Sequence, residues 1–145
     1  MRKHARGTAL PIVLLLAAMM LITASAWLQT SLVAARTTVA ARERVQAFHA
    51  ADSALIRCAQ MLSSAIPGTE LWRNKASFDA LAIQPFIAWP YARRVPQCLI
   101  ESAAQNAYLI TARGFGATAD SEAWLQLRID ANGNKHWRRV VARPF

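Results

Sequence analysis

The first half of the chain contains an unusually long segment without helix-breaking residues. No glycine or proline occurs from Ile12 to Ile66, and alanine, leucine and other residues that favour helices dominate. We therefore expect a single helix over this range, roughly 80 Å long. Pro11 suits its first turn, where the missing N–H is tolerated, and Pro67-Gly68 would end it.

The beginning of this segment is apolar enough to cross a membrane. Thr8 to Leu28 is a run of about 21 mostly apolar residues, or roughly 31 Å of helix. The cations that precede it, Arg2, Lys3 and Arg6, predict a cytoplasmic N-terminus in the inner membrane and a periplasmic C-terminal part. Two alternatives are a signal peptide cut after Ala26 and a simple single-pass anchor. The apolar core exceeds the usual length in signal peptides, which favours its retention.

Charge and composition limit the remaining possibilities. The 145 residues include 17 Lys and Arg against 8 Asp and Glu, enough for a membrane helix and one small, basic domain. This surplus favours anionic partners, DNA included. The histidines, His4, His49 and His136, are isolated, and no metal-ligand spacing, phosphate-binding loop or nucleophile motif occurs. We expect no enzyme activity, no metal and no cofactor.

Two cysteines, Cys58 and Cys98, both follow the predicted membrane segment, in a compartment that permits disulfides. Cys58 belongs to a stripe of apolar residues spaced three or four apart, which would face the core: Phe48, Ala51, Leu55, Cys58 and Leu62. A Cys58–Cys98 bridge would close a loop of about 40 residues and stabilise the fold by roughly 4 kcal/mol. The alternative is two separate buried thiols.

The second half begins with a loop-rich connector, residues 67–96, in which 71–82 could form a short helix. Short β-like runs follow and predict an antiparallel meander: 97–102, 107–113, 122–130 and 135–142. An Asn132-Gly133 type I′ turn would join the last two. The lower half of the long helix would cover the sheet, which gives an α+β fold.

Alternation within 122–130 predicts one face toward the core and one toward solvent. The core side would hold Ala123, Leu125, Leu127 and Ile129, and the solvent side Trp124, Gln126, Arg128 and Asp130.

Two segments resemble the type IV pilin superfamily and, within it, the PilX-type minor pilins and pilus assembly proteins. Arg6-Gly7-Thr8-Ala9-Leu10 before an apolar helix is similar to a class III leader cut by prepilin peptidase after Gly7. Residues 42–55 are similar to the Arg-x-x-Ala-Phe-x-Ala-Ala-acid-x-Ala-Leu run of that subfamily, with Asp52 where Glu is usual.

The resemblance implies a pilin-like organisation. Residues 1–7 would be the leader, 8–34 the transmembrane and assembly helix, 35–66 its amphipathic second half, 67–96 the connector and 97–145 the periplasmic sheet. Thr8 would carry the new, usually methylated N-terminus, and Leu10, Ile12 and Leu16 would pack against other pilin helices. The implied partners are major and minor pilins, prepilin peptidase, the inner-membrane assembly platform and membrane lipid. The implied final location is a pilus on the cell surface.

Ile12 is the departure from the family pattern that bears most on function. Most pilins place glutamate at this fifth residue after the cut, where it pairs with the N-terminal amine of a neighbouring subunit. PilX-type proteins and the similar tip pseudopilin of type II secretion commonly lack it. The resemblance thus implies a subunit that initiates or caps a type IV pilus serving motility, adhesion or DNA uptake.

Two other functions remain open. The chain could be a type II secretion minor pseudopilin, although it lacks room for the large insertion common in those tip subunits. It could also bind DNA directly through its basic C-terminal hairpin, with Lys135, Arg138 and Arg139 as candidate contacts.

Overall fold

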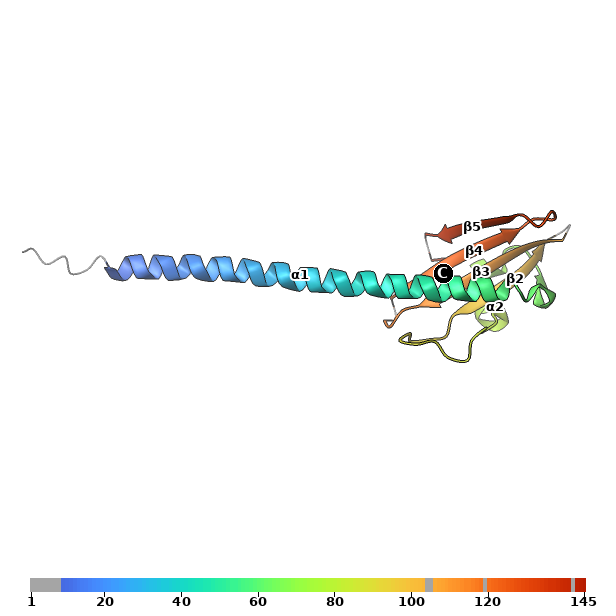
Figure 1. The fold of residues 1–145 in the computed structure, drawn as a ribbon, viewed down its shortest axis with the longest axis horizontal. Helices are drawn as coiled ribbons and strands as arrows, with labels where there is room; N and C mark the ends of the chain where they lie inside the picture. The colour runs from blue at the N-terminus through green and yellow to red at the C-terminus, as the bar shows by residue number, and fades with distance from the viewer. Residues whose placement is uncertain (1–8, 104–105, 119, 142) are drawn as a thin grey trace, which may run out of the picture. The chain divides into compact units, whose positions relative to one another are not determined.

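The computed structural model describes residues 9–103, 106–118, 120–141 and 143–145, and it divides into two compact units, residues 1–39 and 40–145. Its long helix and mostly antiparallel sheet confirm the α+β fold (Figure 1). The elements in chain order are α1 (Ala9–Cys58), η1 (Leu62–Ser64), β1 (Ile66–Pro67), η2 (Leu71–Arg73), α2 (Lys75–Leu81), β2 (Gln97–Ala103), β3 (Ala107–Phe115), β4 (Glu122–Ile129) and β5 (Lys135–Val140).

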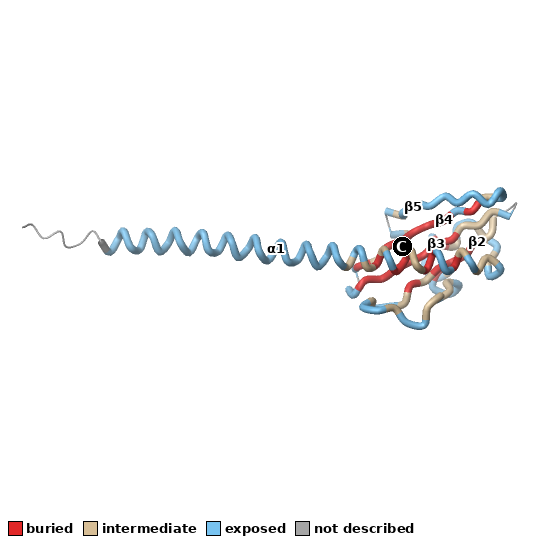
Figure 2. Tube along the Cα trace, in the orientation of Figure 1, coloured by how far each residue is buried: buried red, intermediate tan, exposed pale blue. Residues whose placement is uncertain are grey.

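The part of α1 in the first unit has no core of its own. Every residue from Leu10 to Val39 is exposed (Figure 2), and the helix is long and apolar enough to span a membrane. Most of its hydroxyl groups donate to carbonyls one turn back, as Thr23 does to Met20 at 2.9 Å and Ser25 to Ile22 at 2.8 Å. These polar side chains are therefore satisfied inside the helix, as an apolar environment requires.

Helix α1 ends at Cys58, so the prediction that it continues to Ile66 is wrong. The last turn tightens there, where the N–H of Met61 donates to the carbonyl of Cys58 at 2.9 Å. The chain then turns so that Ile66 and Pro67 form β1, which pairs in parallel with β2. Pairing with a distant strand outweighs local helix propensity here, and proline is tolerated because β1 is an edge strand.

The sheet has the order β1-β2-β3-β4-β5, and β2 to β5 form the predicted antiparallel meander. The parallel strand β1 was not predicted. The predicted strand ends shift by a few residues, since β3 extends to Phe115 and β5 ends at Val140. The sequence thus predicted which of these strands form more accurately than where each strand ends.

The C-terminal part of α1 packs tightly on one face of the sheet. In Figure 1 its last turns cross in front of β3 and β4. A Cβ atom placed on Gly114 of β3 would lie 2.1 Å from the Ala47 carbonyl oxygen and 2.3 Å from the Ala51 nitrogen. Ala47 and Ala51 are fully buried. Small residues on both surfaces thus allow the helix backbone to rest directly on the strand.

The predicted apolar stripe is confirmed only in its middle. Ala51, Leu55 and Cys58 are buried in this interface, whereas Phe48 is half-buried. Leu62 lies beyond the helix end, in η1, and still packs against the same core.

The opposite face of the sheet is also covered, which the sequence analysis did not predict. Trp72 of η2 and Phe78 of α2 pack with Trp124 of β4, whose ring centroid lies 5.0 Å from that of Phe78. Trp124, predicted to face solvent, is therefore buried, and Gln126 on the same face is buried as well. The connector forms a second layer, within which Asn74 caps α2 by accepting the N–H of Ser77 at 3.2 Å.

The turn between β4 and β5 is not of type I′. Gly133 has a φ of +83°, but Asn132 has no positive φ, whereas a type I′ turn needs both. The N–H of Gly133 donates to the carbonyl of Asp130 at 3.0 Å, and the N–H of Asp130 donates to the carbonyl of Asn134 at 3.1 Å. This is a three-residue loop. It is favoured because the Asp130 carboxylate accepts the N–H groups of Asn132 and Asn134.

Candidate functional site

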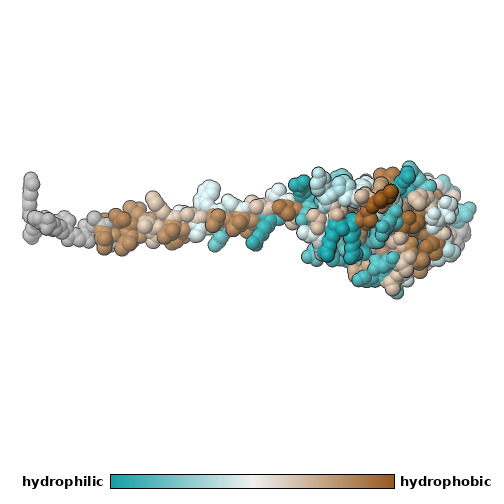
Figure 3. Space-filling view, turned by 90° about the horizontal axis from the view of Figure 1, so that it is seen from below, coloured by the Kyte–Doolittle hydropathy of each residue, from teal (hydrophilic) through white to brown (hydrophobic). Residues whose placement is uncertain are grey.

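The apolar surface of α1 is the first candidate site. The predicted assembly residues Leu10, Ile12 and Leu16 are all exposed, each by more than half of its surface. Hydrophobic side chains cover much of this part of the helix (Figure 3). Gly7 and Thr8, predicted at the cleavage site, lie outside the described residues. The first acidic residue of the whole chain is Glu43, so this apolar surface carries no carboxylate.

Glu43 belongs to the folded domain. Its carboxylate accepts a hydrogen bond from the Thr118 hydroxyl, in the connection between β3 and β4. Nearby, the Gln46 side-chain amide donates to the Pro90 carbonyl at 3.2 Å. The domain therefore holds α1 from about Glu43 onward, and the exposed residues before Glu43 are available for other contacts.

The structure contains the predicted disulfide between Cys58 and Cys98, whose Cα atoms are 6.6 Å apart. Both residues are fully buried. Cys98 also pairs through its backbone with Ile83, and the two N–H···O distances are 2.7 and 2.9 Å. The bridge thus joins the end of α1 to β2 and to the segment that leads into it.

The residues predicted to contact DNA do not lie on one face. Successive residues of a strand point to opposite sides, and Trp137 packs against Phe48 of α1 with ring centroids 6.1 Å apart. Lys135 and Arg139 share the side of Trp137. Arg138 lies on the other side, where its Nε donates to the Gln126 side-chain oxygen at 2.8 Å.

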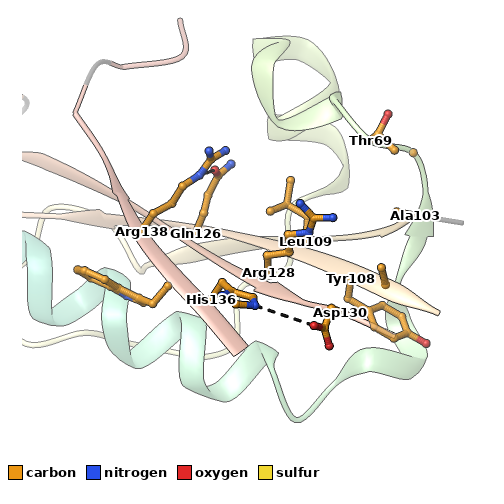
Figure 4. Close-up of a pocket in the computed structure, with 12 residues that line it drawn as sticks. Thr69, Ala103, Tyr108, Leu109, Gln126, Arg128, Asp130, His136 and Arg138 are labelled. Atoms are coloured by element: carbon orange, nitrogen blue, oxygen red, sulfur yellow. Dashed lines mark hydrogen bonds and ion pairs between the residues drawn. The ribbon is translucent and has the colours of Figure 1, made fainter. Parts of the chain in front are cut away.

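A cleft of about 670 Å³ opens on the side of the sheet that Arg138 faces (Figure 4). Arg138, Gln126 and Arg128 rise from the same side of the sheet, and Thr69 lies across from them. Alternation along β4 placed Gln126 and Arg128 toward solvent, and nothing in it predicted this cleft. The signal available was the run of polar residues at alternate positions of both hairpin strands.

A buried chain of hydrogen bonds supports one wall of the cleft. Gln126 is fully buried and donates through Nε2 to the hydroxyl of Thr111, also fully buried, at 2.9 Å. Arginine can only donate, so the Gln126 oxygen must face Arg138. The Arg138 guanidinium is therefore oriented by Gln126, which is itself oriented by Thr111.

Asp130 lies at the turn end of the cleft. The side chain of Asn134 donates to its carboxylate at 2.9 Å and, together with backbone N–H groups, lowers the pKa of Asp130. His136 Nε2 lies 3.9 Å from the same carboxylate. The Asp130 carboxylate is thus used mainly to stabilise the turn between β4 and β5.

Two further polar groups are buried but serve packing. Arg113 pairs with Glu122 at 2.7 Å and lies over the ring of Phe115, with its guanidinium carbon 4.7 Å from the centroid. Glu101 is fully buried and accepts the Leu71 N–H at 2.7 Å, while burial raises the pKa of its carboxyl group. Neither group lines the cleft.

Within the described ranges, no three His, Cys, Asp or Glu residues gather as metal ligands. Protein-family models, curated proteins and solved structures gave no match to this chain. The proposed function below therefore rests on the sequence and structure of this chain.

Proposed function

We propose that this protein is a minor pilin that helps to initiate or cap a type IV pilus. The main support is the unbroken helix α1, which is exposed and apolar from Leu10 to Val33 and packs on a disulfide-closed sheet from Ala47 to Cys58. This combination suits a protein that is stored in a membrane through one part of the helix and presents a folded domain on the other.

The apolar surface supports a role in assembly, with no bond chemistry. In the membrane, lipid would cover Leu10, Ile12 and Leu16. After extraction, equivalent helices of other pilins would replace the lipid, with close packing as the driving force. Small residues between Ala17 and Ala26 would let neighbouring helices approach closely.

The missing acid supports a minor position in the filament. If Thr8 carries the N-terminal ammonium, no carboxylate of this chain precedes Glu43, and Ile12 stands where a pilin glutamate would be. An ammonium buried without a partner costs several kcal/mol. Such a subunit is a poor repeating unit and suits the end of a filament better.

The decisive experiment is N-terminal and intact-mass analysis of the protein from strains with and without prepilin peptidase. We expect a methylated Thr8 in the first strain and an uncut chain in the second. A mature N-terminus at Trp27, or at Met1 in both strains, would contradict the proposal. Deletion of the gene should reduce surface pili. Loss of protein secretion with normal pili would instead indicate the type II secretion pseudopilin.

Direct DNA binding is a second candidate, favoured by the exposure of every residue from Lys135 to Arg139. Replacing Arg138 and Arg139 by Ala should then weaken salt-sensitive retention of DNA by the protein. Unchanged retention would exclude this function for the hairpin.

A further inference from the structure

The sheet face opposite α1 is only partly covered by the connector layer. Trp72 and Phe78 cover it around Trp124, but it is open from Gln126 toward the β4–β5 turn. The cleft of about 670 Å³ occupies this open part. Its size falls within the roughly 300–1,000 Å³ typical of small-molecule sites.

The cleft gathers cations that have no acidic partner. Arg128 lies directly across from His136, and Arg138 lies across from Gln126, so the two arginines are diagonal neighbours on one face. Like charges on neighbouring positions of a sheet destabilise it. Among the described residues, no carboxylate forms an ion pair with Arg128 or Arg138. A bound anion would relieve this repulsion.

Arg138 is also held in a fixed orientation. Gln126 and Thr111 are fully buried, and burying such a polar pair is less favourable than burying apolar side chains of the same size. Their hydrogen bonds fix the Arg138 Nε, and within the described part of the chain both terminal amino groups of the guanidinium have no hydrogen-bond partner. A group oriented before binding loses less entropy when it binds.

The lining indicates the class of ligand. A guanidinium fork matches the two oxygens of a carboxylate or a phosphate. The rest of the lining combines polar or small residues, Thr69, His136, Gly68 and Ala103, with Leu109 and the aromatic residues Tyr108 and Trp137. Such a mixed wall suits a ligand that has both hydroxyl groups and apolar ring faces.

We propose that this cleft binds a monosaccharide-sized ligand, a sugar acid or a sugar phosphate, whose oxyanion is held between Arg138 and Arg128. This binding site does not depend on the proposed pilin function, and it would be the same in a type II secretion pseudopilin.

The test uses the full chain, labelled with ¹⁵N, in micelles of an uncharged detergent. Glucuronate and glucose 6-phosphate are titrated while the arginine Nε–Hε resonances are followed, with glucose as the uncharged control and inorganic phosphate as the bare oxyanion. We expect saturable shifts of the Arg138 resonance with at least one of the two sugar anions and none with glucose. Saturation by only one of them identifies the carboxylate or the phosphate as the anion recognised.

Two variants of β5 form a matched pair. Arg138→Gln and Arg139→Gln each remove one charge from adjacent positions, but only Arg138 faces the cleft. We expect Arg138→Gln and Arg128→Gln to weaken binding about tenfold or more, the scale of a lost charge-assisted hydrogen bond, and Arg139→Gln to bind as the parent protein does.

Three results would overturn the proposal. The first is the absence of saturation by either sugar anion at roughly millimolar concentrations and above. The second is equal weakening by Arg138→Gln and Arg139→Gln, as general attraction to a basic hairpin would give. The third is binding of inorganic phosphate that is as tight as that of both sugar ligands, because the cleft would then not recognise the sugar.

Discussion

Glu101 shows how a single buried carboxyl group makes stability depend on pH. One of its oxygens accepts the Leu71 N–H, and the other has no hydrogen-bond partner among the described residues. Burial raises the pKa of Glu101, and this outweighs the backbone N–H groups of Leu71 and Trp72, which act in the opposite direction. The folded state therefore holds the proton more tightly than the unfolded chain does.

The free energy of unfolding should accordingly fall as pH rises from the ordinary glutamate pKa to the raised pKa of folded Glu101. Glu101→Gln keeps an oxygen for the Leu71 N–H and removes the charge. We expect this variant to be more stable at neutral pH by about 1 kcal/mol, or about 4–8 °C in Tm, and to lose that part of the pH dependence. Calorimetry of the full chain in detergent over a pH series measures both effects.

Glu122→Gln is the control, because Glu122 is paired with Arg113 at 2.7 Å. The same substitution there should lower Tm, since it removes the closer of the two carboxylates that pair with the buried Arg113 guanidinium, the other being Asp79 at 3.5 Å. A Glu101→Gln variant that is less stable than the parent protein at neutral pH would show that the Glu101 carboxylate contributes favourably to the fold.

The contact between α1 and β3 is set by the absence of a side chain at Gly114. Gly114→Ala would place a Cβ 2.1 Å from a backbone oxygen of the helix, which no rotamer change can relieve. We expect a loss of about 3 kcal/mol, the upper part of the range for overpacked cores, measured as a fall in Tm.

Gly133→Ala provides the comparison for this prediction. A Cβ atom placed on Gly133 would meet no heavy atom within 4 Å, but the residue has a φ of +83°. Its replacement should therefore cost only about 1 kcal/mol of backbone strain. Equal losses in the two variants would mean that α1 can move away from β3 at little cost.

The disulfide joins the end of α1 to β2 and closes a loop that contains η1, β1, η2 and α2. Cys58 and Cys98 are separated by 40 residues, so the double variant Cys58→Ala/Cys98→Ala should lose about 4 kcal/mol on the chain-entropy model. Hydrogen exchange should increase most in α2 and η2, which the closed loop constrains. The parent protein in reductant is the matched control, and it should resemble the variant. Equal Tm values for the oxidised parent and the variant would contradict the prediction.

At the scale of the whole molecule, local sequence patterns predicted which helices and strands form. They did not predict the features that depend on contacts between distant residues. Helix propensity and strand alternation indicated α1 and the meander β2 to β5. The end of α1 at Cys58 depends on the pairing of β1 with β2, and no helix-breaking residue marks it. Alternation predicted that Trp124 faces solvent, because it cannot show that the connector folds over this residue.

The candidate sites follow the same division. The Cys58–Cys98 bridge could be predicted because one helical stripe placed Cys58 toward the core. Lys135, Arg138 and Arg139 were grouped because they are close in sequence, but strand alternation separates Arg138 from the other two. The alternating polar residues of both strands were a signal for the cleft, but the register of β4 and β5, which makes Arg128 and Arg138 diagonal neighbours, was not evident from the sequence.

The proposed position at a filament end makes a prediction about Ile12. If the missing acid limits this chain to a minor position, Ile12→Glu should supply the partner for a neighbouring N-terminal ammonium and remove an uncompensated charge worth several kcal/mol. The number of copies along each pilus should then rise several-fold. Labelling of a C-terminal tag on isolated filaments counts these copies directly.

Val13→Glu is the matched control, because it adds the same charge one residue further along the helix, where α-helical geometry turns it by roughly 100° to another side. This variant should enter filaments no more often than the parent protein. A rise in copy number with both variants, or with neither, would show that the missing carboxylate does not decide where this subunit sits, and the explanation would then have to lie in the folded domain.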